Sequence, residues 1–298
     1  MTLKSNKFTV LSSAPRSVVG EGPVWLPDAE ELYWVDILGD RVHSYRLSDG
    51  QVNSIKIGPY PSCVMPNDDG NLVVTIKDKV VLLNPQNGSI IRTLATVNEG
   101  VNNRFNDCKC DPMGRLVAGT MDMNEKSPTG SLYILDTAGL RKIWSSVTVS
   151  NGITWSKDGS VMYYIDSPTR KVTIFKYNVN EGTLEGPIDY IDLSSFPGLP
   201  DGMTIDSEGY LWVALYGGGR VLRVDPINHS VIDQLTLPVQ YTTSCTFGGN
   251  DLKTLFITTA LPPPYNAAII NKQISGLDGY IFSFSLNIKG IIVNKCKL

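Results

Sequence analysis

Six oxygen-bearing residues recur along the chain at nearly constant spacing, and together they have the chemistry of a cation site. They are Glu21, Ser62, Asn106, Asn151, Asp201 and Thr243. Successive members are 41, 44, 45, 50 and 42 residues apart, and each stands a few residues before a turn and an apolar run. This regularity predicts that the six occupy equivalent positions in six copies of one structural unit.

The expected chemistry follows from the donor atoms. Two carboxylates and two carboxamides that face one another are costly to bury without a partner. A divalent cation removes that cost, and oxygen donors without His or Cys suit Ca²⁺ or Mg²⁺. We therefore expect one divalent cation, Ca²⁺ first, with Zn²⁺, Mg²⁺ or Mn²⁺ as alternatives. The competing interpretation is that these polar side chains cap inner strands and bond to the backbone.

The elements that position these residues are short strands. Each copy contains a polar residue, three or four small or apolar residues, a turn rich in Asp, Gly and Pro, and an apolar run. A third strand-like run follows in each copy, and a fourth in most. Six copies of 40–50 residues predict an all-β fold. The specific prediction is a six-bladed β-propeller with four-stranded blades around a central metal-binding channel.

The chain shows no linker or break in composition, so we expect a single domain over residues 1–298 and not a two-domain sandwich. Closing the ring requires an outer strand for the last blade. Both Phe8–Ser12 and Ile291–Asn294 have the composition for that strand, and the sequence does not choose between them.

Charge and hydropathy exclude several classes of partner. The 26 basic and 29 acidic residues nearly balance, and no run of Lys or Arg exceeds two residues, so we expect no nucleic-acid partner. No apolar stretch approaches the roughly 18 residues of a membrane span, and the N-terminus lacks the apolar region of a signal peptide. The expectation is a cytoplasmic protein, a monomer or weak dimer, that acts on a small molecule.

The chain has five cysteines, at positions 63, 108, 110, 245 and 296. An odd count without a signal peptide favours reduced thiols in a reducing cytosol over a disulfide scaffold. Cys108 and Cys110 are at strand spacing, so both would lie on one face. We expect two small buried side chains there and not a redox or zinc pair, for which partner ligands are lacking.

Other catalytic devices are absent from the sequence. His43 and His229 lie in outer-strand or turn contexts, which predicts packing or surface roles and no Ser-His-Asp triad. The Gly217–Arg220 segment lacks the helix and Lys of a phosphate loop and is expected to form a hairpin. Four tryptophans recur at matching positions and are expected in the core: Trp25, Trp34, Trp155 and Trp212.

Several linked motifs, in order along nearly the whole chain, resemble the SMP-30/gluconolactonase/luciferin-regenerating-enzyme family, also called regucalcin-like. They are Glu21-Gly-Pro-Val-Trp25, Asn102-Asn-Arg-Phe-Asn-Asp107, Ala118-Gly-Thr-Met121, Ser150-Asn-Gly152, Tyr163-Tyr-Ile-Asp-Ser167 and Pro200-Asp-Gly-Met203. The resemblance implies a six-bladed propeller with one axial divalent metal, held by the residues that match Glu21, Asn151 and Asp201. It also implies that Arg104 and Asn106 contact the substrate.

Family members hydrolyse sugar lactones, the animal proteins are calcium-binding and cytosolic, and the firefly branch acts on oxyluciferin. Two departures bear on the substrate. Cys108 replaces a common Gly beside the site, and Asn124 falls opposite a Glu that contacts substrate in the vertebrate proteins. The lid segment Asp122–Pro128 is also compact. Substrate preference therefore does not transfer with the fold.

The leading hypothesis is a metal-dependent lactonase acting on a lactone or ester. Asp201 would be the general base, Arg104 would clamp substrate hydroxyls or developing charge, and Asn106 would orient the ring or the water. Asn124 is the third expected substrate contact. The alternatives are a calcium-binding regulatory protein of regucalcin type without turnover, and a luciferin-regenerating-enzyme-like hydrolase of a non-sugar substrate.

Overall fold

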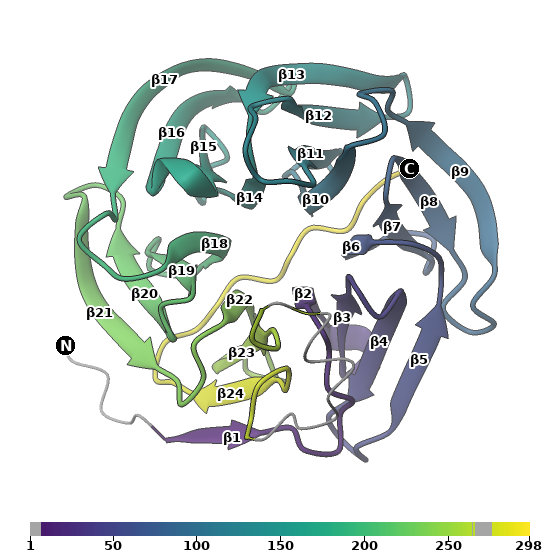
Figure 1. Ribbon diagram of the computed structural model, residues 1–298, viewed down its shortest axis with the longest axis vertical. Helices are drawn as coiled ribbons and strands as arrows, with labels where there is room; N and C mark the ends of the chain where they lie inside the picture. Colours follow the sequence, from purple (N-terminus) through teal and green to yellow (C-terminus); the bar gives the residue numbers. More distant parts are fainter. Residues whose placement is uncertain (1–6, 264, 266–275) are drawn as a thin grey trace.

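The strands form six four-stranded antiparallel sheets, which are arranged as blades around one axis (Figure 1). The computed structural model describes residues 7–263, 265 and 276–298. This arrangement confirms the predicted six-bladed β-propeller. Among the described residues, no helix is long and apolar enough to cross a membrane.

Five blades consist of four consecutive strands each, with the first strand nearest the axis (Figure 1). From inside to outside, the first two blades are β2 (Gly20–Leu26), β3 (Glu31–Asp36), β4 (Arg41–Arg46) and β5 (Val52–Lys56), then β6 (Pro61–Pro66), β7 (Leu72–Ile76), β8 (Lys79–Leu83) and β9 (Ile90–Thr96). The third is β10 (Asn103–Cys110), β11 (Leu116–Asp122), β12 (Gly130–Asp136) and β13 (Gly139–Val147). The fourth and fifth are β14 (Ser150–Trp155), β15 (Val161–Asp166), β16 (Lys171–Asn178) and β17 (Thr183–Asp192), then β18 (Leu199–Ile205), β19 (Leu211–Tyr216), β20 (Arg220–Asp225) and β21 (Ser230–Thr236).

The last blade joins the two ends of the chain. Its order from the axis outward is β22 (Thr242–Gly248), β23 (Thr254–Thr259), β24 (Phe282–Ser285) and β1 (Phe8–Val10). The N-terminal strand pairs antiparallel with β24, Phe8 opposite Phe284. Of the two candidates for this closing strand, the N-terminal one is therefore used, and residues 291–294 form no strand. Two short 3₁₀ helices, η1 (Pro27–Ala29) and η2 (Ser167–Thr169), lie in connections.

The hydrophobic core lies between neighbouring blades. Middle strands such as β7 are apolar and buried over their whole length because both of their faces pack against another blade. Outer strands such as β9 are largely exposed. All four recurring tryptophans are buried, which confirms the prediction that they belong to the core.

The remaining local predictions also have clear outcomes. Residues 217–219 connect β19 and β20 as a hairpin. His43 is buried with its ring centroid 5.1 Å from that of Trp34, a packing role. His229 is partly exposed, 3.6 Å from the Asp189 carboxylate at the surface.

After β24 the chain crosses one face of the ring and ends near the second and third blades (Figure 1). The Gly290 amide donates to the Leu252 carbonyl at 2.8 Å, and the Cys296 amide donates to the Pro66 carbonyl at 2.7 Å. Between these points Val293 lines a small cavity with residues of the inner strands. This C-terminal segment, residues 286–298, therefore closes one end of the central channel.

Two disulfide bonds contradict the prediction of reduced thiols. Cys63 is bonded to Cys108, and Cys110 is bonded to Cys296, with Cα–Cα distances of 5.8 and 5.5 Å. Cys245 is the free cysteine. Cys108 and Cys110 are buried on one face, as predicted, but each meets a partner from a distant part of the sequence. The cysteine count therefore no longer supports a reducing compartment, and a cytoplasmic location stays a prediction.

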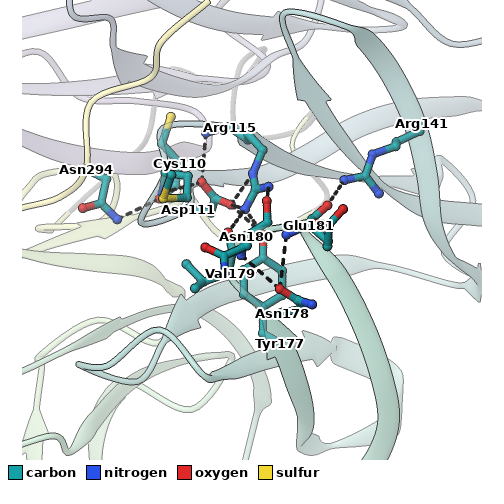
Figure 2. Close-up of polar contacts among 11 residues, drawn as sticks. Cys110, Asp111, Arg115, Arg141, Tyr177, Asn178, Val179, Asn180, Glu181 and Asn294 are labelled. Atoms are coloured by element: carbon teal, nitrogen blue, oxygen red, sulfur yellow. Dashed lines mark hydrogen bonds and ion pairs between the residues drawn. The ribbon is translucent and has the colours of Figure 1, made fainter.

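A buried ionic network joins the third and fourth blades (Figure 2). The Asp111 carboxylate, fully buried, accepts hydrogen bonds from Arg115 Nε at 2.7 Å and from the Tyr177 hydroxyl at 2.6 Å. Arg115 also donates to the Val179 carbonyl of the fourth blade at 2.5 Å. Every charge in this network has an opposite charge or a hydrogen-bond partner, which is the condition for burying such groups.

Candidate active site

Each of the six register positions lies on an innermost strand beside a break in strand pairing. In the first blade the pairing with β3 passes from Glu21 to Val24, and in the fifth the pairing with β19 passes from Pro200 to Met203. The other four innermost strands are interrupted at equivalent points. A β-bulge bends a strand and redirects a side chain. The bulges therefore explain how residues inside continuous strands face the axis.

A glycine follows each of the three expected metal ligands, Glu21, Asn151 and Asp201. At one of them, Gly152, a Cβ atom would lie 2.8 Å from the Asp201 carbonyl oxygen, closer than real Cβ contacts. At another, Gly202, it would collide with the side chain of Ser244. The glycines thus let adjacent inner strands approach closely enough for the polar side chains to converge.

These side chains converge on a cavity of 650 Å³ at the end of the channel opposite the C-terminal segment. Five predicted site residues line it together: Glu21, Arg104, Asn106, Asn151 and Asp201.

The two remaining register positions bond within the protein. Thr243 also lines the cavity, but its hydroxyl donates to the Gly20 carbonyl at 2.5 Å. The Ser62 hydroxyl shares a hydrogen bond of 2.8 Å with Thr75. The competing interpretation, a side chain bonded to the backbone, is therefore correct for Thr243, whereas Ser62 bonds to another side chain.

A chain of hydrogen bonds fixes the amides. Asn151 Nδ2 donates to the Ser167 hydroxyl at 2.8 Å, so its carbonyl oxygen is directed the other way. That oxygen accepts a bond of 3.0 Å from Asn106 Nδ2, which also donates to the Ser150 carbonyl at 2.7 Å. Arg104 Nη1 donates to Asn106 Oδ1 at 2.7 Å. Both amides and the guanidinium are therefore held in one orientation before any ligand binds.

The two carboxylates of the site are destabilised in their charged forms. Burial, together with the nearby Asp107 charge, raises the pKa of Glu21 to about 8. Burial and the charge of Glu21 raise the pKa of Asp201 well above its usual range. Burial also lowers the pKa of Arg104 to about 10, which leaves it charged at neutral pH. The two carboxyl groups are thus too buried, and too close to other acidic groups, to be charged together readily.

The donor set fits a hard divalent cation. Glu21, Asn151 and Asp201 are 6 to 9% exposed and offer oxygen atoms alone. Among the described residues, no group of three His, Cys, Asp or Glu side chains could hold a metal ion. The set named here differs from such a group because it combines two carboxylates with an amide. Oxygen donors of this kind suit Ca²⁺ or Mg²⁺, and a cation would offset the repulsion that raises both carboxyl pKa values.

Two half-buried groups of opposite charge beneath the site were not anticipated from the sequence. Asp107 and Lys109 line the small inner cavity next to the disulfide of Cys63 and Cys108. Burial raises the pKa of Asp107 to about 6 and lowers that of Lys109, whose Nζ donates to the Met203 carbonyl at 2.7 Å. The sequence did hold one signal for this pair. Asp107 directly follows Asn106, and Lys109 is two residues further on, so the two charged side chains are at the spacing of one strand face.

The lid presents a different residue from the one expected. Asn124 donates from its backbone and its side chain to the Asp122 carboxylate, at 3.0 and 3.3 Å, and does not line the cavity. Its neighbour Glu125 does line the cavity and attracts Arg104 electrostatically. Asp122 also accepts bonds from the amides of Lys126 and Ser127, which folds the segment compactly. Matching this segment residue by residue to the vertebrate proteins could not reveal that Glu125, one position after Asn124, is the residue that lines the cavity.

Comparison with known proteins agrees with this geometry. The family model described as "SMP-30/Gluconolactonase/LRE-like region" matches residues 19–261. A Bacillus subtilis protein provisionally named as a sugar lactone lactonase, YvrE, is 41% identical over 252 residues, 84% of this chain and 86% of that one.

Two solved structures share the whole fold. A luciferin-regenerating enzyme superimposes with a TM-score of 0.88 at 29% identity, covering 98% of this chain and 99% of that one. Agrobacterium tumefaciens regucalcin, described as a calcium-binding protein, has a TM-score of 0.87 at 26% identity, with 97% of each chain covered. The chain therefore belongs to the SMP-30/gluconolactonase/LRE-like family.

Proposed function

We propose that this protein hydrolyses a lactone at a divalent cation held by Glu21, Asn151 and Asp201. One observation carries the proposal: two buried carboxylates with raised pKa values and an oriented amide converge beside a guanidinium in one cavity. The family supports lactone hydrolysis as the kind of reaction, through relatives named as sugar lactone lactonase and regucalcin.

A cation bound there would draw electron density from the substrate's carbonyl oxygen and favour attack by water. Asp201 acts as the general base: it takes a proton from water as the water oxygen bonds to the carbonyl carbon. The ring C–O bond then breaks, and the same proton passes to the departing alkoxide. Burial raises the pKa of Asp201, and a bound cation would favour its charged form, in which the carboxylate can accept a proton.

Arg104 stabilises the negative charge that develops on the carbonyl oxygen. Asn106 positions Arg104 and Asn151, because its amide bonds to both side chains. Its second amide proton bonds to the Ser150 carbonyl, so no donor of Asn106 is left for the substrate. Glu125 contributes a carboxylate at the rim of the cavity, where it attracts Arg104.

The test is a lactone panel assayed on metal-stripped protein with Ca²⁺, Mg²⁺, Mn²⁺ or Zn²⁺ added back. Asp201→Asn is expected to lower kcat by about 10²–10⁴-fold, the range for loss of a general base. Ser62→Ala is the matched control, because Ser62 holds the same register position but bonds to Thr75 instead of lining the cavity. Full activity in Asp201→Asn, or activity that no cation restores, contradicts the mechanism.

The second candidate is a calcium-binding protein without turnover, which the calcium-binding description of the Agrobacterium regucalcin favours. Arg104→Met separates the two functions. An enzyme loses hydrolysis in this variant while its cation affinity is retained, because Arg104 is not among the proposed ligands. A wild-type protein that binds the cation yet hydrolyses no lactone is the binding protein.

A further inference from the structure

The cavity has two regions of different chemistry. Its floor is formed by the inner strands and carries the polar groups described above. Its walls come from strand ends and the connections between strands and are largely aliphatic or sulfur-containing, with tyrosines at Tyr60 and Tyr216. Aliphatic and sulfur-containing residues of the wall include Ile37, Leu38, Met121, Met123, Val149 and Leu199. We propose that the substrate is a lactone whose ring bears a hydrocarbon substituent, which packs against this wall.

The volume of the cavity supports a substituent. A hexonolactone has twelve heavy atoms and occupies roughly 200 Å³ at the close packing of organic crystals. The cavity of 650 Å³ would therefore hold such a ring on the floor and leave roughly two thirds of its space unfilled. A side chain on the ring extends into this space.

The hydrogen bonds of the site argue against a larger polyhydroxylated substrate. Asn106 uses its oxygen and both amide protons within the protein. The Ser167 hydroxyl accepts from Asn151 and donates to the Pro200 carbonyl at 2.6 Å. The Thr243 hydroxyl is likewise bonded, to Gly20 and Thr258. These groups are therefore already committed within the protein, and Glu125 and Tyr60 are the polar side chains of the wall that could meet sugar hydroxyls beyond the ring.

The tyrosines add to this imbalance. Tyr216 and Tyr265, which both line the cavity, share a hydrogen bond with one another. Hydroxyl groups buried against an aliphatic wall without partners lose their bonds to water, whereas methylene groups gain by leaving water. The wall therefore selects a hydrocarbon chain over a second polar group.

The inference rests on the proposed lactonase, so its test has a kinetic part and a binding part. The kinetic part compares δ-valerolactone, δ-hexalactone, δ-octalactone and δ-decalactone with glucono-1,5-lactone. We expect kcat/KM to rise with chain length by up to about fourfold per methylene, which is about 0.8 kcal/mol for each methylene buried. A preference for gluconolactone, or no rise along the series, overturns the inference.

Wall variants locate the effect. Met123→Gln and Leu38→Gln are expected to lower the ratio of kcat/KM for δ-decalactone over δ-valerolactone by about tenfold, because both half-buried side chains line the cavity. Met113→Gln is the matched control, since Met113 is 48% exposed in a turn outside the cavity. An unchanged ratio in both wall variants overturns the proposed packing.

The binding part distinguishes failure of the inference from failure of the lactonase proposal. The corresponding δ-lactams are not hydrolysed, and their affinity for the wild-type protein and for Asp201→Asn is measured by calorimetry. Affinity that rises with alkyl length supports the apolar wall even if no lactone is turned over. Hydrolysis without such a rise keeps the lactonase and overturns the substrate class.

Discussion

The disulfide between Cys110 and Cys296 is expected to be a major source of stability, since it closes a loop over a sequence separation of 186 residues. In the chain-entropy description, a crosslink of that span removes about 18 cal/mol/K from the unfolded chain, or about 5 kcal/mol at 25 °C. Measured values fall at or below such estimates, so Cys110→Ala/Cys296→Ala should lower the free energy of unfolding by about 3–5 kcal/mol.

The same loss can be expressed as a melting temperature. With about 2.1 cal/mol/K of unfolding entropy per residue, the 298 residues give about 0.6 kcal/mol/K at the midpoint. A loss of about 4 kcal/mol therefore lowers Tm by about 6 °C. Calorimetry and urea unfolding both measure the change, and a reducing agent should produce a similar or larger fall in the wild-type protein.

Cys245→Ala is the matched control, because Cys245 is a buried free thiol whose removal deletes a sulfur atom without breaking a crosslink. Thiol titration of the unfolded protein should find one reactive group before reduction and five after it, since Cys245 alone is unpaired among the five cysteines. The reasoning is refuted if the double variant loses no more stability than Cys245→Ala, or if reduction leaves Tm unchanged.

Two further predictions concern buried polar groups. Burial lowers the pKa of His43 from 6.5 to about 4, so the unfolded chain binds the proton more strongly, and stability present above pH 6.5 is lost as pH falls to 4. This loss is at most about 3 kcal/mol. In the His43→Gln variant, Tm should therefore fall less between pH 7 and pH 4 than it does in the wild-type protein. An equal fall in both proteins would contradict the assignment of the pH dependence to His43. Tyr177→Phe removes the hydroxyl bond to Asp111 and should cost about 2 kcal/mol in urea unfolding. Tyr190→Phe, at a residue 46% exposed, is its control and should cost little; an equal loss in both would show that the buried bond is not responsible.

The fold was predictable because each blade repeats the same local pattern. The spacing from Glu21 to Thr243 placed six residues at one register, and all six lie on innermost strands at a bulge. The turns, the apolar middle strands and the axial polar residue are all short-range features. They can be recognised without knowing which blades touch.

Contacts between distant segments could not be predicted in the same way. Cys63 meets Cys108 because β6 and β10 are adjacent inner strands, and Cys110 meets Cys296 because the C-terminal segment crosses the ring. Neither approach leaves a periodic signal in the sequence. The lid differs for a local reason: the Asp122 carboxylate binds the backbone of Asn124, so the next residue reaches the cavity.

The hydrogen bonds of the six register positions explain why a ring of similar blades forms an asymmetric site. Ser62 and Thr243 carry hydroxyls bonded to neighbouring groups, whereas Glu21, Asn106, Asn151 and Asp201 bring carboxyl and amide groups to the cavity. Three of them, Glu21, Asn151 and Asp201, would hold a cation in the cavity that Arg104 also lines. The asymmetry of the site therefore comes from which blades carry hydroxyls bonded within the protein and which carry carboxyl groups that line the cavity.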